Sequence, residues 1–233
     1  MLNRLRYAFE KGTYRPINVR HIFEIISRRK KSPPFFIQVG SFDGVSNDPI
    51  HEYVKNFNWK GILVEPMPPF FEKLKKNYSD ARGLIFENVG VGDKEGEFDF
   101  YHLPAEYNEP QWLQQIGSFS RDSLVVNLKD THPDLIGHIQ HRRINAVTLN
   151  ELMRKHTVSD IDVLNIDAEG FEYRILKDMN KLASKPCAIL FEWGCMNKND
   201  LSNLLNVLQQ NDYTLFTSSG DMVALHKTAF EKF

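Results

Sequence analysis

After the paired prolines Pro33 and Pro34, the chain alternates short apolar runs with amphipathic stretches at a regular spacing. The apolar runs predict strands over residues 35–39, 61–64, 84–89, 161–166 and 186–191. The amphipathic stretches predict helices over residues 48–57, 68–78, 148–155, 170–179 and 198–210, and another helix over 18–31 precedes the prolines. Because strand, turn and helix repeat in this order, the sequence predicts a mostly parallel sheet with helices on both faces.

The last two predicted strands, residues 213–217 and 222–226, are joined only by the four residues Ser218–Asp221. A connection this short closes an antiparallel hairpin, whereas a parallel crossover needs a dozen residues or more. We therefore expect an α/β fold with seven strands in one sheet, of which the last runs antiparallel.

The composition excludes several classes of protein. With 233 residues and 42% apolar residues, the chain can build a substantial core, which excludes a disordered or fibrous protein. The 29 basic and 30 acidic residues leave a net charge of -1, so we expect no binding to nucleic acid and favour a small neutral or polar substrate. The two cysteines, Cys187 and Cys195, are too few for a disulfide framework or a thiolate metal site.

No stretch approaches the roughly 18 apolar residues of a membrane span. The amino terminus carries charged side chains and no apolar run of signal-peptide length; these are Arg4, Arg6, Glu10, Lys11 and Arg15. We therefore expect a cytoplasmic protein. We also expect residues 1–233 to form one domain, with a helical lead-in over residues 1–34.

The stretch from residue 103 to residue 147 lacks the regular pattern of the rest. We predict a small hairpin around residues 97–102 and then an irregular insertion. Long connections of this kind commonly form lids or substrate walls, so the insertion is a candidate for the acceptor-binding region.

Ligands of parallel sheets bind beyond the carboxyl ends of the strands. Nearly every predicted strand here is followed by a glycine or a carboxylate, which a purely structural sheet does not require. The candidate site residues at these ends are Gly40, Asp43, Gly44, Glu65, Pro66, Asn88, Val89, Asp167, Glu169 and Glu192.

Gly40 and Gly44 bound a tight turn after the first predicted strand of the sheet, and Glu65 lies 21 residues beyond Gly44. That distance is typical of the acid that binds a ribose diol at the end of the second strand of a nucleotide-binding unit. The turn is GxxxG rather than GxGxxG, so it lacks the glycine packing suited to a dinucleotide pyrophosphate. An adenosine-bearing cofactor without a pyrophosphate is favoured, although an ordinary turn between strand and helix would also explain the glycines.

Four segments of this sequence resemble FkbM-type methyltransferases. They are Phe36–Gly44, Gly61–Pro66, Asn88–Asp93 and Val163–Glu172, and the run from Ile166 to Glu172 is the most specific of them. The resemblance extends over residues 35–226. It implies a Rossmann-like class I methyltransferase fold, S-adenosyl-L-methionine as the cofactor, and methyl transfer usually to oxygen.

Residue by residue, the resemblance implies that Gly40, Asp43 and Gly44 line the methionine part of the cofactor. Glu65 with Pro66 would hold the ribose, and Asn88 with Val89 would flank the adenine. Asp167 and Glu169 would face the same cleft. Gln38 stands where many proteins of the wider superfamily have an acid, which makes a contact of this side chain with the methionine amino group less secure.

Asp167 is the first candidate for the general base that accepts the proton of the methyl acceptor. The alternative is that Asp167 caps the predicted helix that begins at Gly170. Glu192 ends an apolar strand, where it either faces the cleft or pairs with a basic group. If it faces the cleft, it is the catalytic substitute for Asp167 as the base. Glu172 is expected to act on the helix dipole or in packing.

His132, His138 and His141 lie within ten residues of one another. They have no companion carboxylate motif, and Arg142 and Arg143 beside them would repel a cation, so we expect a solvated helix face and no metal. The segment Trp112–Ser120 could order over the cofactor or the acceptor. The base could also be a histidine of the insertion.

The sequence thus predicts an S-adenosylmethionine-dependent methyltransferase, most simply one that methylates a hydroxyl group of a sugar, glycan or secondary metabolite. An NAD-type oxidoreductase shares the strand, glycine turn and Glu65, but it is disfavoured by the absence of GxGxxG and by the terminal hairpin. A methyltransferase-like binding protein without catalysis is the third possibility. The sequence does not identify the acceptor or the oligomeric state.

Overall fold

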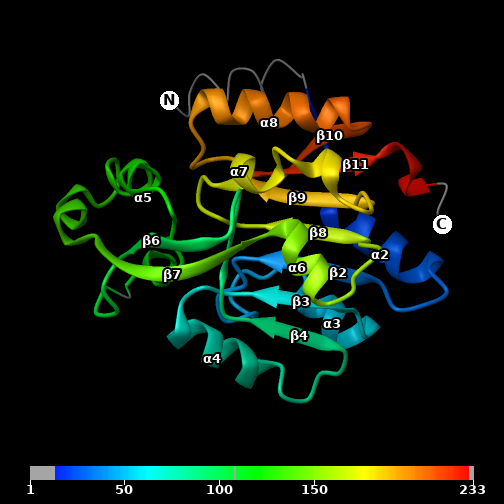
Figure 1. The fold of residues 1–233 in the computed structure, drawn as a ribbon, viewed down its shortest axis with the longest axis horizontal. Helices are drawn as coiled ribbons and strands as arrows, with labels where there is room; N and C mark the ends of the chain where they lie inside the picture. Colours follow the sequence, from blue (N-terminus) through cyan, green and yellow to red (C-terminus); the bar gives the residue numbers. More distant parts are fainter. Residues whose placement is uncertain (1–13, 108, 231–233) are drawn as a thin grey trace.

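The computed structural model describes residues 14–107 and 109–230, so the charged residues predicted to open the chain, Arg4, Arg6, Glu10 and Lys11, lie outside the described part. Its centre is a sheet of order β1-β10-β11-β9-β8-β2-β3-β4 (Figure 1). The strands are β1 (Arg15–Pro16), β2 (Phe35–Val39), β3 (Lys60–Val64), β4 (Leu84–Glu87), β8 (Val163–Ile166), β9 (Ala188–Glu192), β10 (Tyr213–Ser218) and β11 (Asp221–His226). The seven predicted strands are confirmed, and the two-residue β1 is added beside β10.

The predicted reversal of the last strand is confirmed. β11 lies between β9 and β10 and runs antiparallel to both. Ser218 pairs with Asp221, so the turn between β10 and β11 consists only of Ser219 and Gly220. Both turn residues have positive φ angles, 48° and 103°, which are the angles that a tight two-residue hairpin turn requires.

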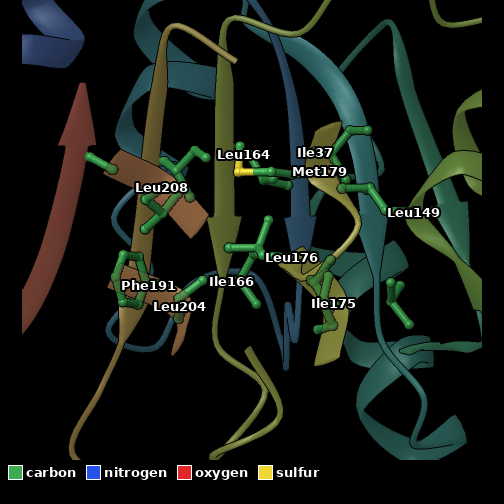
Figure 2. Close-up of a cluster of buried hydrophobic side chains, with 14 of the residues drawn as sticks. Ile37, Leu149, Leu164, Ile166, Ile175, Leu176, Met179, Phe191, Leu204 and Leu208 are labelled. Atoms are coloured by element: carbon green, nitrogen blue, oxygen red, sulfur yellow. The ribbon is translucent and has the colours of Figure 1, made fainter. Parts of the chain in front are cut away.

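Helices cover both faces of the sheet, as predicted. On one face lie α2 (Val19–Arg29), α3 (His51–Phe57) and α4 (Pro68–Asn77), which pack against a cluster that includes Phe36 and Leu63. On the other face lie α6 (Leu149–Lys155), α7 (Glu172–Leu176) and α8 (Lys198–Gln210). Figure 2 shows this second layer, in which Ile37, Leu164, Ile166 and Phe191 of the strands meet Leu176, Leu204 and Leu208 of the helices. Because both faces are covered, the strands are nearly continuous apolar runs.

Local chemistry sets the ends of these helices. Thr148 caps α6 and Asn197 caps α8 by accepting the backbone N–H of the residue three positions on, which satisfies a donor that the first turn leaves unpaired. The helix predicted over residues 170–179 is shorter than expected: α7 begins at Glu172, and a 3₁₀ turn η3 (Met179–Lys181) follows it. Glu169 and Gly170 have φ angles of 50° and 93°, which no right-handed helix accepts.

The region between β4 and α6 differs most from the prediction. β5 (Gly90–Gly92), β6 (Gly96–His102) and β7 (Gln140–Thr148) form a second sheet in the order β5-β7-β6. β6 pairs antiparallel with β7, about forty residues later in the chain, so the predicted local hairpin around residues 97–102 is wrong. Figure 1 shows β6, β7 and α5 extending from one side of the main sheet.

The stretch over residues 103–147 is also less irregular than expected. Besides β7 it holds η1 (Gln111–Gln114), α5 (Arg121–Leu128) and η2 (Pro133–His138). Outside this stretch, another 3₁₀ turn, η4 (Lys227–Phe230), follows β11. A separate apolar cluster supports the stretch, with Leu113, Ile116 and Leu128 at its centre. None of the helices in the described part is long and apolar enough to span a membrane.

Candidate active site

A cavity of about 350 Å³ lies at the carboxyl ends of β2, β3 and β8, which is the edge of the sheet where the sequence places the site. This volume lies in the range of small-molecule sites. We call one side of it the strand-end side, which is built by Gln38, Gly40, Asp48, Glu65, Val89 and Asp167. The opposite, insertion side is built by Phe100, His102, Gln114, Gln115, Phe119 and Arg142.

Six of the residues predicted to bind the cofactor line this cavity: Gln38, Gly40, Glu65, Pro66, Val89 and Asp167. Five predicted site residues do not line it: Asp43, Gly44, Asn88, Glu169 and Glu192. The cavity therefore brings together the ends of three strands, while the other predicted residues have different local roles.

Glu65 is held in one orientation by two backbone amides. Its Oε2 accepts a hydrogen bond from the Phe42 N–H and its Oε1 accepts one from the Met67 N–H, both at 2.8 Å. Burial raises the pKa of the Glu65 carboxyl to about 8, and the nearby Asp167 raises it further, while the two amides lower it. Each oxygen keeps a second lone-pair site, so this carboxylate can still accept hydrogen bonds from a ligand.

Gln38 presents an unpaired acceptor at the cavity. Its Nε2 donates to the Asp48 carboxylate at 3.1 Å, and this bond orients the amide. The Gln38 Oε1 atom is buried and has no hydrogen-bond partner. A buried carbonyl oxygen without a partner is costly, so Gln38 is prepared to accept a donor from a ligand.

Asp48 is a cavity residue that the sequence reasoning missed. Its carboxylate accepts the N–H groups of Ile50 and His51 at the start of α3, and burial raises its pKa to about 6. In the sequence, Asp48 and Pro49 stand where a helix is expected to begin. This pattern indicates the start of a helix and gives no indication of a ligand site.

Position 40 requires glycine because the backbone at Asp167 lies very close to it. Its φ is 77°, and a Cβ built on it would lie 1.9 Å from the carbonyl oxygen of Asp167. No side chain fits there, so the turns after β2 and β8 can touch only at a glycine. Gly44 has a different role, because its Cβ would meet the side chains of Tyr78 and Leu74 in the core.

Asp43 and Asn88 support the loops around the cavity. The Asp43 carboxylate accepts the N–H groups of Val45 and Ser46, so it stabilises its own turn. The Asn88 side chain donates to the carbonyl oxygens of Glu65 and Pro66, at 2.8 and 3.1 Å. Asn88 therefore positions the Glu65 loop.

The Asp167 side chain is exposed to the cavity, and desolvation by the neighbouring protein raises its pKa to about 6. The alternative that Asp167 caps α7 is wrong. The N-cap residue of α7 is Phe171, and no side chain caps this helix. Glu172 Oε1 instead accepts the N–H groups of Ala168 and Gly170, in the turn before α7, at 2.9 and 3.3 Å. Glu172 is fully buried, and burial raises its pKa to about 8.

Glu169 and Glu192 gather around Cys195 in a separate group. One potential ligand atom from each of these three side chains lies within 4.8 Å of the others. The Asn127 amide donates to Glu169 Oε2, and the Cys195 thiol approaches the same oxygen at 3.2 Å. Burial raises the pKa of the Cys195 thiol, and the two neighbouring carboxyls raise it further. The expected absence of a metal stays a prediction.

The three clustered histidines have separate partners. The His132 ring packs edge-on against Trp112, His138 Nδ1 lies 2.9 Å from the Tyr107 hydroxyl, and His141 Nδ1 lies 3.3 Å from Asp99. They lie in or beside η2 and in β7, so the predicted helix face is wrong, because a non-local strand pairing replaces the helix.

The segment from Trp112 to Ser120 contributes Gln114, Gln115, Gly117 and Phe119 to the insertion side. Trp112 itself packs with the separate apolar cluster of this region. His102, at the end of β6, was also missed by sequence reasoning. Its Nδ1 lies 2.9 Å from the Leu103 carbonyl oxygen. A carbonyl only accepts, so Nδ1 carries the hydrogen and Nε2 of the neutral ring is the basic atom.

Comparison with known proteins places this geometry in context. The methyltransferase FkbM domain matches residues 38–215. No curated protein matches the sequence significantly.

The fold is shared with solved structures of methyltransferases. The crystal structure of methyltransferase FkbM from Methylobacillus flagellatus KT is similar with a TM-score of 0.50 and 12% identity, over 83% of this chain and 44% of that one. A METTL16 methyltransferase domain is similar with a TM-score of 0.50 and 13% identity, over 89% of this chain and 65% of that one. This chain thus spans less than two thirds of either protein, and at these identities the likeness concerns the fold alone.

Proposed function

Because the chain belongs to the FkbM methyltransferase family, we propose that it transfers a methyl group from S-adenosylmethionine to a hydroxyl group of a sugar, glycan or secondary metabolite. The observation that carries this proposal is the Glu65 carboxylate, fixed by two backbone amides at a cavity beside the Gly40 turn. A fixed acceptor of this kind suits two adjacent hydroxyl groups such as those of a ribose.

The strand-end side fits S-adenosylmethionine in its chemistry. The cofactor carries an ammonium group, a sulfonium centre and a ribose diol, all of which favour negative charge or hydrogen-bond acceptors. This side offers the unpaired Gln38 Oε1 and the carboxyls of Asp48, Glu65 and Asp167. Val89 and Met67 add apolar surface suited to an adenine ring. Glu65 would hold the ribose, and Gln38 with the Gly40 turn would hold the methionine part.

When bound, S-adenosylmethionine supplies the methyl group together with its leaving group. The protein must align the acceptor, exclude water and remove the hydroxyl proton. Asp167 is the proposed base, since burial raises its pKa to about 6 and so makes it a stronger base than an exposed aspartate. His102 Nε2 on the opposite side is the second candidate.

Glu192 is no longer the preferred substitute for Asp167. It does not line the cavity, and its Oε2 is buried without a hydrogen-bond partner near Glu169 and Cys195. A base must reach the proton that it abstracts. Burial raises the pKa of Glu192 to about 7, and the nearby Asp167 raises it further.

The test is mass spectrometry of candidate sugars, glycans and secondary metabolites incubated with the protein and isotopically labelled S-adenosylmethionine. We expect the label on a hydroxyl oxygen of one acceptor class. A calorimetric titration with S-adenosylmethionine and with NAD accompanies it. Binding of NAD without binding of S-adenosylmethionine would overturn the proposal in favour of an oxidoreductase. Cofactor binding without transfer to any acceptor in the panel would favour a binding protein without catalysis.

A further inference from the structure

Two consecutive arginines of β7 point to opposite faces of the β6–β7 ribbon and have different surroundings. Arg143 forms ion pairs with Glu97 at 3.1 Å and with Asp99 at 3.5 Å on the outer face. Arg142 lines the cavity, and over residues 14–107 and 109–230 no carboxylate lies within ion-pair distance of it. Because side chains alternate along a strand, the ribbon places one arginine in a charge network and leaves the other without a counter-ion.

Arg142 stands beside an apolar cluster that ties the ribbon to α4. Its direct cross-strand partner is Phe100, which packs in a cluster with Met67 and Phe70. Lys73 follows Phe70 by one helical turn, with its ammonium 5.4 Å from the Phe70 ring, and it also lines the cavity. No ion pair to Lys73 occurs in the described part of the chain either. Two cations without carboxylate partners thus flank the same aromatic cluster.

A third donor faces the same space. Gln115, in the loop after η1, lines the cavity, and its Nε2 is buried with no hydrogen-bond partner. An unpaired buried donor has a cost that a ligand oxygen would remove. The carboxylates of the cavity, Asp48, Glu65 and Asp167, all belong to the strand-end side.

From these contacts we infer that the insertion side, together with Lys73 of α4, binds an anionic group of the methyl acceptor, a carboxylate or a phosphate. Arg142 supplies a bidentate donor for such a group, Lys73 supplies a second positive charge, and Gln115 Nε2 supplies a neutral donor. The inference rests on the proposed function, since it names the acceptor class of the same cavity. It favours acidic or phosphorylated sugars and metabolites over neutral ones.

The test follows the arginine side-chain Nε–Hε signals of the full chain by NMR. Inorganic phosphate probes the phosphate source, D-glucuronate probes the carboxylate source, and D-glucose and chloride serve as neutral and simple-ion controls. The signals of Arg142 and Arg143 are assigned from the variants Arg142→Gln and Arg143→Gln. These two substitutions are matched in chemistry and adjacent in sequence, and Arg143 lies on the outer face.

We expect a saturable shift of the Arg142 signal with phosphate, with glucuronate or with both, and none with glucose or chloride. Arg142→Gln should weaken the binding of the active anion about tenfold, measured on the remaining shifts, whereas Arg143→Gln should leave it unchanged. The anion that binds identifies the source. If neither anion causes a saturable shift at about 50 mM, the inference is overturned, because this concentration fills even a site with a millimolar dissociation constant. Equal weakening of anion binding by both variants also overturns it.

A calorimetric titration of S-adenosylmethionine on the same sample separates this inference from the proposed function. Cofactor binding without an anion shift refutes the anion site and leaves the methyltransferase proposal standing. An anion shift at Arg142 without cofactor binding supports an anion site and refutes the proposed function.

Discussion

On the strand-end side of the cavity the polar groups include the carboxyls of Asp48, Glu65 and Asp167 and the unpaired Gln38 Oε1. On the insertion side they include Arg142, His102 and the unpaired Gln115 Nε2. The first set accepts hydrogen bonds and favours positive charge, and the second set mainly donates them. This difference agrees with our proposal that the two sides bind different ligands: a cofactor rich in donors and positive charge, and an acceptor rich in oxygen.

The two sides are also built differently. The strand-end side is fixed by backbone contacts, such as the amides that hold Glu65 and the contact of Gly40 with the Asp167 carbonyl. The insertion side depends on the pairing of β6 with β7 and on aromatic contacts, among them the edge-to-face contact of Phe100 with Phe119. Substitutions on the two sides should therefore separate cofactor binding from acceptor selection.

The largest effect is expected for Asp167→Asn, which keeps the shape of the side chain but removes the basic carboxylate. If Asp167 is the base, single-turnover methyl transfer should fall by about 100-fold or more, with little change in cofactor affinity or melting temperature. Rapid-quench measurement with saturating S-adenosylmethionine gives this rate. Asp122→Asn, an exposed position in α5 outside the cavity lining, is the control. A near-normal rate in the Asp167 variant would transfer the assignment to His102.

Gly40→Ala should show how rigidly the strand-end side is built. The added Cβ would lie 1.9 Å from a backbone oxygen, at a φ of 77°, so the strands must separate. We expect the free energy of unfolding to fall by at least about 2 kcal/mol, measured by urea denaturation. Gly137→Ala is the matched control, because its Cβ would meet no atom within 4 Å. Equal stability of the two variants would mean that the β2 and β8 turns can separate without cost.

Glu65→Ala should weaken S-adenosylmethionine binding by at least about tenfold, because the variant loses the carboxyl that accepts the hydrogen bonds of the ribose hydroxyls. Calorimetry measures the effect. Arg142→Gln, on the insertion side, should bind the cofactor as the unchanged protein does. If a folded Glu65 variant keeps full affinity, Glu65 does not hold the ribose.

A smaller effect concerns the dependence of stability on pH. Burial raises the pKa of Asp48 and Asp167 to about 6, of Glu192 to about 7, and of Glu65 and Glu172 to about 8. Between pH of about 4.5 and about 8 the folded protein therefore binds more protons than the unfolded chain, so the free energy of unfolding falls as pH rises.

Carboxyls with lowered pKa values, such as Glu87 and Asp93, stabilise the folded protein when the pH is above their pKa in the unfolded chain. They therefore change the free energy of unfolding only at the acid end of this pH range. The melting temperature should thus be higher near pH of about 5.5 than near pH of about 8, and Glu172→Gln should flatten the dependence. A melting temperature that rises steadily over this interval would show that the buried carboxyls are not protonated in the folded state.

The strand-end side could largely be predicted from sequence because its signals are local. A strand followed by a glycine turn, and a strand followed by an acid, are each visible within ten residues, and the parallel order brings their ends together. The same local pattern predicted the antiparallel last strand, since the length of one connection decides it.

The insertion side could not be predicted, because β6 and β7 pair across about forty residues of intervening chain. Without that register, nothing separates Arg142 from Arg143, and nothing places His102 at the cavity. Roles that depend on loop geometry were missed as well. Asn88 was expected at the adenine but bonds to the Glu65 and Pro66 carbonyls. Asp167 was considered as a cap of α7, but α7 begins without a side-chain cap.

Amide hydrogen exchange with and without S-adenosylmethionine tests the central claim most directly, because it reports on both sides of the cavity in one experiment. The account predicts slower exchange on cofactor addition in peptides covering residues 38–48 and 64–70, with little change over residues 111–119 and 140–145. Protection confined to the insertion side, or no protection at the strand ends at saturating cofactor, would contradict the assignment of the strand-end side as the cofactor site.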